Sequence, residues 1–287
     1  MTKILHNSWR VMLLCAALAT SLTASADKLW SDSFDYQVGD LYGQGAWWRL
    51  AAANTDEPVQ VIDDALTFEG YQGTAAGKAV KLSATALKSE RVKREFSDTP
   101  MTEGTLYYAM LVKPTEFPQT NTTKFVIAGL AAKNFNGWGD GIGNTSIYNT
   151  VSISKGSEEG KFQFGFASAQ SVPEPIDGDL DLGKTYLVVV GYDFATKDIS
   201  FWLNPADADA TPTKVLAGKG SFNASNGVQG VCLYQQGSSN AEGTIIVDHV
   251  RVATDMASLF KEEKPQTKGK LLLSDSFQYA KGDLYNQ

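Results

Sequence analysis

The sequence predicts an all-β fold in which two antiparallel sheets pack face to face as a sandwich. Short apolar runs recur along the chain, with glycines, Asn-Gly pairs and prolines as turn signals between them. Residues 162–166 (Phe-Gln-Phe-Gly-Phe) alternate strictly, as expected for a strand with one buried face. Only Asp255–Phe260 has helical character. About 12 antiparallel strands in one unit favour stacked sheets, because stacking hides most of their edges.

Each predicted strand is a period-2 pattern or a short apolar run bounded by turn residues such as Asn136-Gly137, Asn204-Pro205 and Asn226-Gly227. In chain order, the predicted strands are Leu29–Phe34, Val59–Ile62, Ala65–Phe68, Ala79–Leu82, Val92–Phe96, Thr105–Val112, Phe125–Leu130, Thr150–Ser154, Phe162–Ala167, Tyr186–Tyr192, Ile199–Leu203, Val228–Tyr234 and Thr244–Val252.

The composition excludes several classes of protein. The chain has 287 residues, 43% of them hydrophobic and 20% charged, which is ordinary for a globular protein and unlike a disordered or collagenous one. Its formal net charge of −7 argues against a nucleic-acid partner, which requires clustered Lys and Arg. No apolar run reaches the roughly 18–20 residues that a membrane-spanning helix needs.

Residues 1–26 have the pattern of a secretory signal peptide. Lys3 and Arg10 form a basic region, Val11–Ala19 is a short apolar stretch, and Ala24–Ala26 is an A-x-A cleavage site. A short buried core helix is the alternative. The pattern predicts a secreted protein, located extracellularly or at the cell surface. Cleavage before residue 27 would change the net charge from −7 to −9, since only the two basic residues are lost.

The cysteines predict no disulfide in the mature chain. Leu14 before Cys15 argues against a lipoprotein signal, so Cys15 would leave with the signal peptide. Cys232 then remains alone, which rules out an intramolecular bond. It stands in an apolar run and is expected to be a buried small hydrophobic residue.

An internal repeat divides the chain. Residues 31–44 (SDSFDYQVGDLYGQ) and 274–287 (SDSFQYAKGDLYNQ) are identical at ten of fourteen positions, at a constant offset of 243. We therefore expect a β-sandwich domain at 27–260, a charged linker at 261–269 and the first strand of a truncated second repeat at 270–287. The chain would then be a fragment of a longer tandem protein or a truncated reading frame.

The two ends of the predicted domain carry a resemblance to a known superfamily. Residues 29–35 (LWSDSFD) and 247–252 (VDHVRV) are similar to the W-S-D-E-F opening and V-D-Y-V-R-V ending of family 16 glycoside hydrolases. They resemble the concanavalin A-like jelly roll that those enzymes share with laminin-G-like domains. The wider pattern resembles secreted repeat domains of Bacteroidetes-type surface proteins, at residues 39–44, 162–165, 185–189 and 250–254. The resemblance implies a jelly-roll sandwich and says more about fold than about function.

Residues for acid–base or nucleophilic catalysis are scarce. His249 is the only histidine after residue 26, so a histidine-rich zinc site is excluded by count. It follows Asp248 within an alternating strand, and the two side chains are expected to point to opposite faces. We interpret His249 as a structural or surface residue. The acid–histidine–tyrosine set of jelly-roll polysaccharide lyases would have to rely on it.

Paired catalytic carboxylates are not apparent either. The family 16 enzymes carry E-x-D-x-E or E-x-D-x-x-E on one strand, and this chain has no such pattern. Glu158-Glu159 falls in a predicted hairpin turn. The segment Asp177–Asp181 has three carboxylates at every second position. It is either a solvated acidic loop or a calcium chelator. The missing motifs argue against an enzyme.

The resemblance also implies a structural calcium that joins the first and last strands. Asp248 matches one of its ligands, whereas Ser33 stands in place of the acidic one. The alternative is that Asp248 accepts hydrogen bonds from the neighbouring N-terminal turn.

A glycan is the ligand that the sequence favours most. Residues 134–144 form a loop with four glycines in which Trp138, Asp140 and Asn144 combine an aromatic ring with polar groups, and Tyr148 follows closely. Alternatively, Trp138 anchors the loop over the edge of the sandwich.

A second aromatic candidate is Trp47-Trp48-Arg49. Adjacent strand residues point to opposite faces, so one tryptophan is expected in the core and the other at the surface. Trp48 is the candidate for a glycan site.

We therefore expect a secreted, non-catalytic glycan-binding or adhesive module of a cell-surface tandem-repeat protein. Its partners would be a polysaccharide or a glycoprotein glycan and other domains of the same longer chain. A polysaccharide-cleaving enzyme on the same fold and a purely structural spacer are the alternatives. A concave groove with two opposed carboxylates would favour the enzyme.

Overall fold

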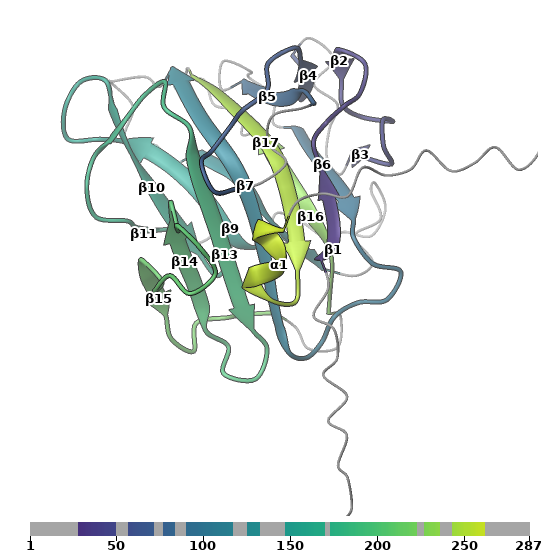
Figure 1. The fold of residues 1–287 in the computed structure, drawn as a ribbon, viewed down its shortest axis with the longest axis vertical. Helices are drawn as coiled ribbons and strands as arrows, with labels where there is room; N and C mark the ends of the chain where they lie inside the picture. The colour runs from purple at the N-terminus through teal and green to yellow at the C-terminus, as the bar shows by residue number, and fades with distance from the viewer. Residues whose placement is uncertain are drawn as a thin grey trace, which may run out of the picture.

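The predicted two-sheet antiparallel β-sandwich of the jelly-roll class is confirmed by a computed structural model (Figure 1). The structure describes residues 28–49, 57–71, 77–83, 90–116, 125–132, 147–169, 173–222, 227–235 and 243–261. The predicted signal peptide and second repeat copy lie outside these residues, as does all but the first residue of the predicted linker.

The first sheet, here called sheet A, contains nine of the strands in the described part of the chain. Its order is β15-β14-β13-β7-β17-β5-β4-β2, and β1 pairs with β17 beside this path. Every pairing in it is antiparallel. The strands are β1 (Lys28–Asp32), β2 (Gly39–Asp40), β4 (Gln60–Ile62), β5 (Ala79–Ser83), β7 (Thr105–Glu116), β13 (Tyr186–Asp193), β14 (Ile199–Leu203), β15 (Lys214–Leu216) and β17 (Thr244–Ala253).

The second sheet, sheet B, contains eight described strands in the order β11-β10-β9-β8-β16-β6-β3, with β12 paired to β10. It is also antiparallel throughout. The strands are β3 (Trp48–Arg49), β6 (Glu90–Glu95), β8 (Phe125–Ala132), β9 (Ile147–Lys155), β10 (Lys161–Ala167), β11 (Glu174–Pro175), β12 (Leu180–Asp181) and β16 (Val228–Gln235).

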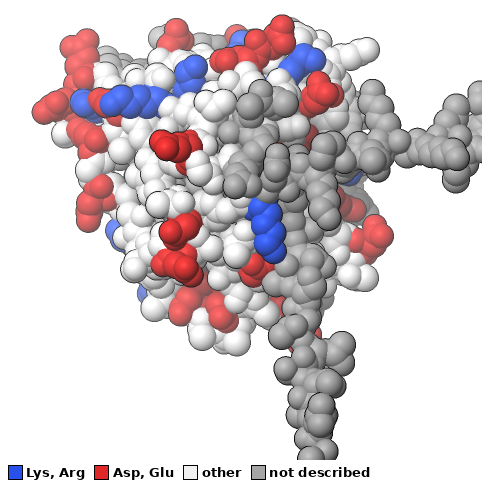
Figure 2. Space-filling view, in the orientation of Figure 1, with Lys and Arg blue, Asp and Glu red and all other residues white. Residues whose placement is uncertain are grey.

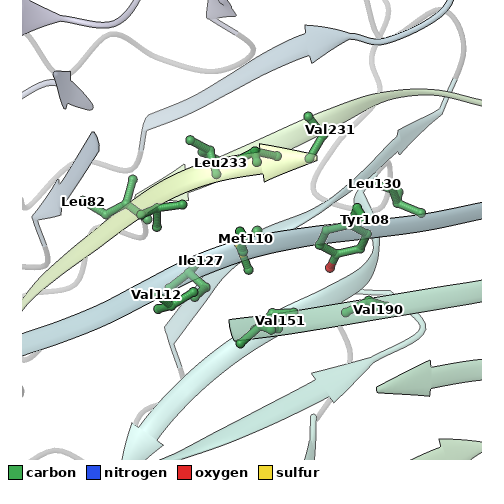
Figure 3. Packing of buried hydrophobic residues seen from close by; sticks show 14 of the residues in the cluster. Leu82, Tyr108, Met110, Val112, Ile127, Leu130, Val151, Val190, Val231 and Leu233 are labelled. Atoms are coloured by element: carbon green, nitrogen blue, oxygen red, sulfur yellow. The ribbon is translucent and has the colours of Figure 1, made fainter. Parts of the chain in front are cut away.

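The hydrophobic core lies between the two sheets because alternate side chains of each strand point inward. Figure 3 shows β7 side chains of sheet A packed against side chains of β8, β9 and β16 of sheet B. The labelled core residues are Leu82, Tyr108, Met110, Val112, Ile127, Leu130, Val151, Val190, Val231 and Leu233. The alternation at Phe162, Phe164 and Phe166 buries all three rings completely, as predicted. Cys232 is also fully buried, as expected from its apolar run.

The outer face of sheet A is covered by the short helix α1 (Met256–Phe260) and by the segment 63–71. In Figure 1, α1 lies in front of the central strands of this sheet. Asp255 caps the helix by accepting a hydrogen bond from the Ser258 amide, at 3.0 Å. Arg251 of β17 is fully buried beneath it, donates to the Leu259 carbonyl at 2.5 Å and lies 3.8 Å from the centre of the Tyr71 ring.

β17 holds three other strands of sheet A together. On one side it pairs with β7, and on the other side with β5 through residues 244–247 and with β1 through residues 250–253. The pairing with β7 shifts register between Asp248 and Arg251, where His249 has a positive φ of 47°. This bulge separates the two parts of the strand, so that β5 and β1 share the same edge.

Twelve of the thirteen predicted strands contain or overlap a strand of the structure, and one prediction is wrong. Residues 65–68 form no strand, because Leu66 packs on the outer face of sheet A and its amide bonds the Asp248 side chain instead of a neighbouring strand. The first predicted strand ends early, at Asp32, because Phe34 adopts a left-handed conformation with φ 54°. The predicted helix is confirmed as α1.

The charge distribution agrees with the acidic composition. Figure 2 shows acidic side chains scattered over one face, both at its edge and within it, with fewer basic side chains among them. No helix of the described residues is long and apolar enough to cross a membrane.

Arg251→Ala is expected to destabilise the domain by roughly 2–4 kcal/mol, because it removes a charged hydrogen bond and a buried cation–π contact. Urea denaturation measures the loss. Lys261→Ala is the matched control at the same helix end, since Lys261 is exposed and only 3.4 Å from the Ser258 hydroxyl; we expect a change under about 0.5 kcal/mol. Equal effects of the two substitutions would show that Arg251 does not fasten α1.

Candidate functional site

A pocket of about 360 Å³ opens where the edge of sheet B meets β1 of sheet A. It is lined by Trp30 of β1, by Ala46 and Trp48, and by residues 94–98 at the end of β6. We call it the edge pocket. Its walls come from segments far apart in sequence, which β17 and the β3–β6 pairing bring together.

Trp48 presents its indole ring to solvent at this pocket. It pairs with Lys93 on β6 and remains 60% exposed, whereas Trp47 is fully buried. Adjacent strand residues point to opposite faces, and this division between core and surface follows. An exposed indole beside a pocket offers a flat apolar face to a ligand.

Trp30 forms the second aromatic wall and is held by the core. Its ring makes an edge contact with Trp47 at a centroid distance of 5.9 Å, and Trp47 packs against Phe34 at 5.7 Å. The indole Nε1 of Trp47 donates to Asp32 at 2.9 Å. Since Trp30 and Asp32 lie on β1 while Trp47 leads into β3, these contacts connect the two halves of the pocket.

Arg94 lines the pocket beside Trp30, without a hydrogen-bonding partner in the described part of the chain. Its guanidinium carbon is 5.9 Å from the centre of the Trp30 ring, and within the described part of the chain its side chain makes no hydrogen bond or ion pair. Nearby cations differ: Lys93 donates to Glu95 at 2.7 Å, and Arg49 pairs with Asp40 at 2.8 Å. Arg94 is therefore available to an anionic or polar ligand group.

The far wall of the pocket is a fixed polar turn. The Ser97 hydroxyl donates to the Thr99 carbonyl at 2.7 Å, and the Gln229 side chain donates to the Ser97 carbonyl at 3.0 Å. Glu95 and Asp98 add two carboxylates to the lining, and Glu95 is neutralised by Lys93. The pocket thus combines stacking faces, hydrogen-bond acceptors and one unpaired cation.

Two cations of β6 lie on the outer side of sheet B and are almost fully buried. Arg91 and Lys93 alternate with core residues on β6 and so point outward. Arg91 donates to the Tyr234 hydroxyl at 3.0 Å and stacks on its ring at 4.3 Å. Arg94 alternates with these two cations and therefore lies on the other face of the strand, together with Val92.

The structure separates the sequence-predicted glycan residues. Trp138, Asp140 and Asn144 lie outside the described residues. Tyr148 is on β9, where its ring packs 4.2 Å from that of Phe222. Trp48 is on β3, four strand spacings away in sheet B, or roughly 19 Å. Trp48 and Tyr148 therefore do not share one site.

Sequence reasoning missed Trp30 and Arg94 as pocket residues. The signal at β6 was its composition: Glu-Arg-Val-Lys-Arg-Glu carries five charges on six strand residues, which is unusual for a strand inside a sheet. In the sequence, Trp30 belongs to the motif at residues 29–35, which carries no signal of a pocket. Its neighbourhood depends on the pairing of β1 with residues 250–253 of β17, which are more than two hundred positions away.

The prediction that Asp248 and His249 point to opposite faces is wrong. Both side chains are fully buried, with His249 Nε2 3.7 Å from Asp248 Oδ2. The bulge at His249 is the reason, because a residue with positive φ breaks the alternation of the strand. The surface alternative for His249 is also wrong, and its role as a structural residue agrees with this burial.

Asp248 is a buried, hydrogen-bonded carboxyl group. It accepts from the amides of His249 at 2.6 Å and Leu66 at 2.8 Å, so its donors are its own neighbour and the 63–71 segment rather than the N-terminal turn. Burial raises the pKa of Asp248 to about 8. No group of three potential metal-ligating side chains occurs among the residues that the structure describes. Calcium at Asp248 stays a prediction.

Two of the three acids in the loop at 177–181 are bonded to neighbouring segments. Asp179 accepts from the backbone and side chain of Ser157 and from Gln163, at 2.5–2.9 Å. Asp181 pairs with Lys161 and Lys184, which lower the pKa of its carboxyl group. These bonds give the loop a structural role.

The chain is similar to several solved structures at low sequence identity. No protein-family model and no curated protein matches the chain. Among solved structures, a carbohydrate esterase from the Shiga toxin-encoding bacteriophage phi24B is 11% identical, with a TM-score of 0.48 over 80% of this chain and 99% of that one. The catalytic domain of a glycoside hydrolase family 131 protein from Coprinopsis cinerea is 12% identical, with a TM-score of 0.46 over 84% and 96%.

An alginate lyase is 13% identical to this chain, with a TM-score of 0.44 over 77% of this chain and 96% of that one. At these identities and TM-scores, none of the three likenesses decides what this chain binds or whether it is an enzyme.

Asp248→Asn is expected to flatten the dependence of stability on pH. The raised pKa means that the folded chain keeps a proton that the unfolded chain releases above about pH 4. The stability contributed by this proton is complete below about pH 4 and is lost as the pH rises through about 8. Urea midpoints measured across that range should fall for the unsubstituted chain and fall less for D248N.

The slope of stability against pH is the readout, because D248N also weakens hydrogen bonds and lowers stability at every pH. Burial also raises the pKa of Asp32, which leaves a residual slope of the same sign. An unchanged slope in D248N would contradict the raised pKa of Asp248. A calcium ion on Asp248 requires the ionised carboxylate, and predicts instead that a chelator lowers the melting temperature of the unsubstituted chain but not of D248N.

Proposed function

We propose that the chain is a non-catalytic saccharide-binding module and that the edge pocket is its binding site. The single observation that carries the proposal is the indole of Trp48, 60% exposed on the wall of a polar pocket whose lining also includes Trp30. Tryptophan is enriched among the residues that contribute most to binding, and its indole has a large apolar face. A sugar ring has apolar faces and polar edges, which match an indole beside hydrogen-bonding groups.

The pocket supplies the polar contacts that a saccharide needs. Ser97 and Asp98 lie on the rim, where their oxygen atoms can accept hydrogen bonds from sugar hydroxyl groups. The turn that carries them is fixed by hydrogen bonds, so little order must be gained on binding. The pattern of residues 1–26 supports an extracellular setting, where the partner would be a polysaccharide or a glycoprotein glycan.

Arg94 supports a more specific ligand, a saccharide with a carboxylate or sulfate group. The Arg94 side chain has no hydrogen-bond or ion-pair partner among the described residues. Guanidinium groups bind planar anions through paired charge-assisted hydrogen bonds. The sugar ring would then stack on Trp48 while its anionic group bonds Arg94.

Trp48→Ala is expected to weaken binding of a saccharide found by glycan-array screening by roughly 30-fold, as measured by calorimetry. The melting temperature should change little, because Trp48 is exposed. Val215→Ala is the matched control, since Val215 is 45% exposed on β15, in the other sheet. Loss of stability without loss of binding would make Trp48 a structural residue, and no binding on any array would favour the spacer alternative.

The same saccharide also tests for an enzyme. Glu95 and Asp98 are the carboxylates of the pocket lining, and Lys93 holds Glu95 in an ion pair. We expect no release of reducing ends or unsaturated products on prolonged incubation. Release that disappears in Glu95→Gln would replace the binding module with a polysaccharide-cleaving enzyme.

Arg94→Met is expected to weaken binding of an acidic saccharide by roughly 10- to 100-fold, because it removes charge-assisted hydrogen bonds. Binding of a neutral saccharide of the same length should change less than about 3-fold. Arg94→Lys keeps the charge and should recover part of the preference, and added salt should reduce it. Equal affinity of the unsubstituted chain for acidic and neutral saccharides would contradict the role of Arg94 and leave that of Trp48 standing.

A further inference from the structure

The two copies of the repeated motif differ only where the structure tolerates a difference. We refer to residues 31–44 as the opening unit and to residues 274–287 as the second copy. The opening unit contains the end of β1, the turn after it, β2 and the turn that leads to β3. The structural role of each of its residues is visible, so each match or mismatch in the second copy can be assessed.

The centre of the opening unit is the buried carboxylate of Asp32. It accepts hydrogen bonds from the Phe34 amide at 2.8 Å, the Tyr36 hydroxyl at 2.6 Å and Trp47 Nε1 at 2.9 Å. Phe34 is fully buried against Trp47. All three unit residues recur in the second copy, as Asp275, Phe277 and Tyr279.

The second half of the unit is retained in the same way. Leu41 is fully buried, and Asp40 pairs with Arg49, whose guanidinium also lies 4.3 Å from the centre of the Tyr42 ring. The Gln44 side chain closes the turn with three hydrogen bonds, two to residue 37 and one to residue 40. The counterparts of Asp40, Leu41, Tyr42 and Gln44 are Asp283, Leu284, Tyr285 and Gln287.

The four differences fall at permissive positions. Asp35 and Gln37 are exposed, and Val38 is 62% exposed; the second copy has Gln278, Ala280 and Lys281 there. Gln37 contributes only its backbone groups to the turn.

Gly43, the fourth differing position, has φ 85° and open space where a Cβ would be. Asn286 replaces it, and asparagine is enriched at positive φ. The second copy therefore keeps every buried and every hydrogen-bonding side chain of the unit, and it lacks only the exposed ion pair of Asp35 with Lys78, at 3.9 Å.

We propose that residues 271–287 are an alternative opening unit that exchanges with residues 28–44 on the same sandwich. The acceptor consists of the β17 edge at residues 250–253, the Val59 carbonyl that bonds Leu41, and the side chains of Trp47 and Arg49. None of these groups belongs to residues 28–44. They would bond the second copy through identical residues.

The exchange is feasible within one chain. Lys28, the first residue of β1, pairs with Ala253, only a few residues before α1. Ten residues, 261–270, connect the end of α1 to Leu271, and such a segment spans up to roughly 33–36 Å. Gly45 and Ala46, at φ 51° and 61°, follow the opening unit and form the hinge at which it would leave β3.

The exchange changes the edge pocket. Residues 28–30 (Lys-Leu-Trp) align with residues 271–273 (Leu-Leu-Leu), so Leu273 would take the place of Trp30. The strand keeps its apolar character but loses the second aromatic wall and the ring beside Arg94. This consequence depends on the proposed function, whereas the exchange itself does not.

A double-substitution series in the full chain tests the exchange by melting temperature. Phe34→Ala disables the opening unit, and the second copy should then take its place, with only a small loss. Phe34→Ala combined with Phe277→Ala disables both, and the melting temperature should fall by roughly 6–20 °C, as expected for a buried phenylalanine in a domain of this size. Phe277→Ala alone should change little.

Lys281→Ala in the Phe34→Ala background is the matched control, because the aligned Val38 is exposed. It should leave the melting temperature unchanged. If Phe277→Ala makes no difference in the Phe34→Ala background, the second copy does not occupy the site and the proposal is wrong. A melting temperature of the F34A chain that rises with protein concentration would show exchange between chains and contradict the same-chain arrangement. Neither result depends on saccharide binding.

Discussion

The bulge in β17 is the constraint on which the rest of the structure depends. Without the bulge, the edge of β17 that faces away from β7 would be continuous, and a single strand could pair along its whole length. The positive φ at His249 divides that edge, so that β5 pairs with residues 244–247 and β1 pairs with residues 250–253. The N-terminal strand is thereby fixed next to sheet B. The bulge residues are buried and bonded, as expected for a feature that sets strand geometry.

One carboxylate then connects the two sheets at this corner. Asp32 lies at the end of β1 in sheet A, and its partner Trp47 immediately precedes β3 in sheet B. A buried acid is costly, and burial raises the pKa of Asp32, but three donors surround it. The same interaction that fastens β1 also orients the tryptophan pair, with Trp47 inward and Trp48 outward. The edge pocket therefore depends on the hydrogen bond between Asp32 and Trp47.

The sequence predicted the sandwich well because long strands have local signals. The strict alternation at 162–166 and the apolar runs of β7, β13 and β17 are decided by which face is buried. Two-residue strands such as β2, β3 and β11 have no such period, since they exist only through their partners. The misassigned segment at 65–68 has apolar residues for another reason: it covers the outer face of sheet A. The bulge at His249 was also invisible, because no glycine marks it.

The site was less predictable than the fold. Trp48 was found because adjacent tryptophans must divide between core and surface. Arg94 was not, because it is one of three cations on β6 and nothing distinguishes it until Trp30 is placed beside it by a strand pairing more than two hundred residues apart. The loop around Trp138 has the composition of a binding loop, but that composition also suits an anchor. Local sequence thus identifies candidate aromatic residues, and the pairing of strands distant in sequence determines which of them line a pocket.

The repeat and the pocket meet in the same strand, and this links the two proposals thermodynamically. A ligand that requires Trp30 binds only the arrangement in which residues 28–44 occupy the β17 edge. Such a ligand stabilises that arrangement over the exchanged one by about 2.7 kcal/mol when its concentration is a hundred times its Kd. The identical buried residues of the two units imply that the two arrangements have similar free energies. In that case saccharide binding would determine which unit pairs with the β17 edge. Linkage also runs in reverse, because weakening the second copy would strengthen apparent saccharide affinity by removing its competitor for the edge.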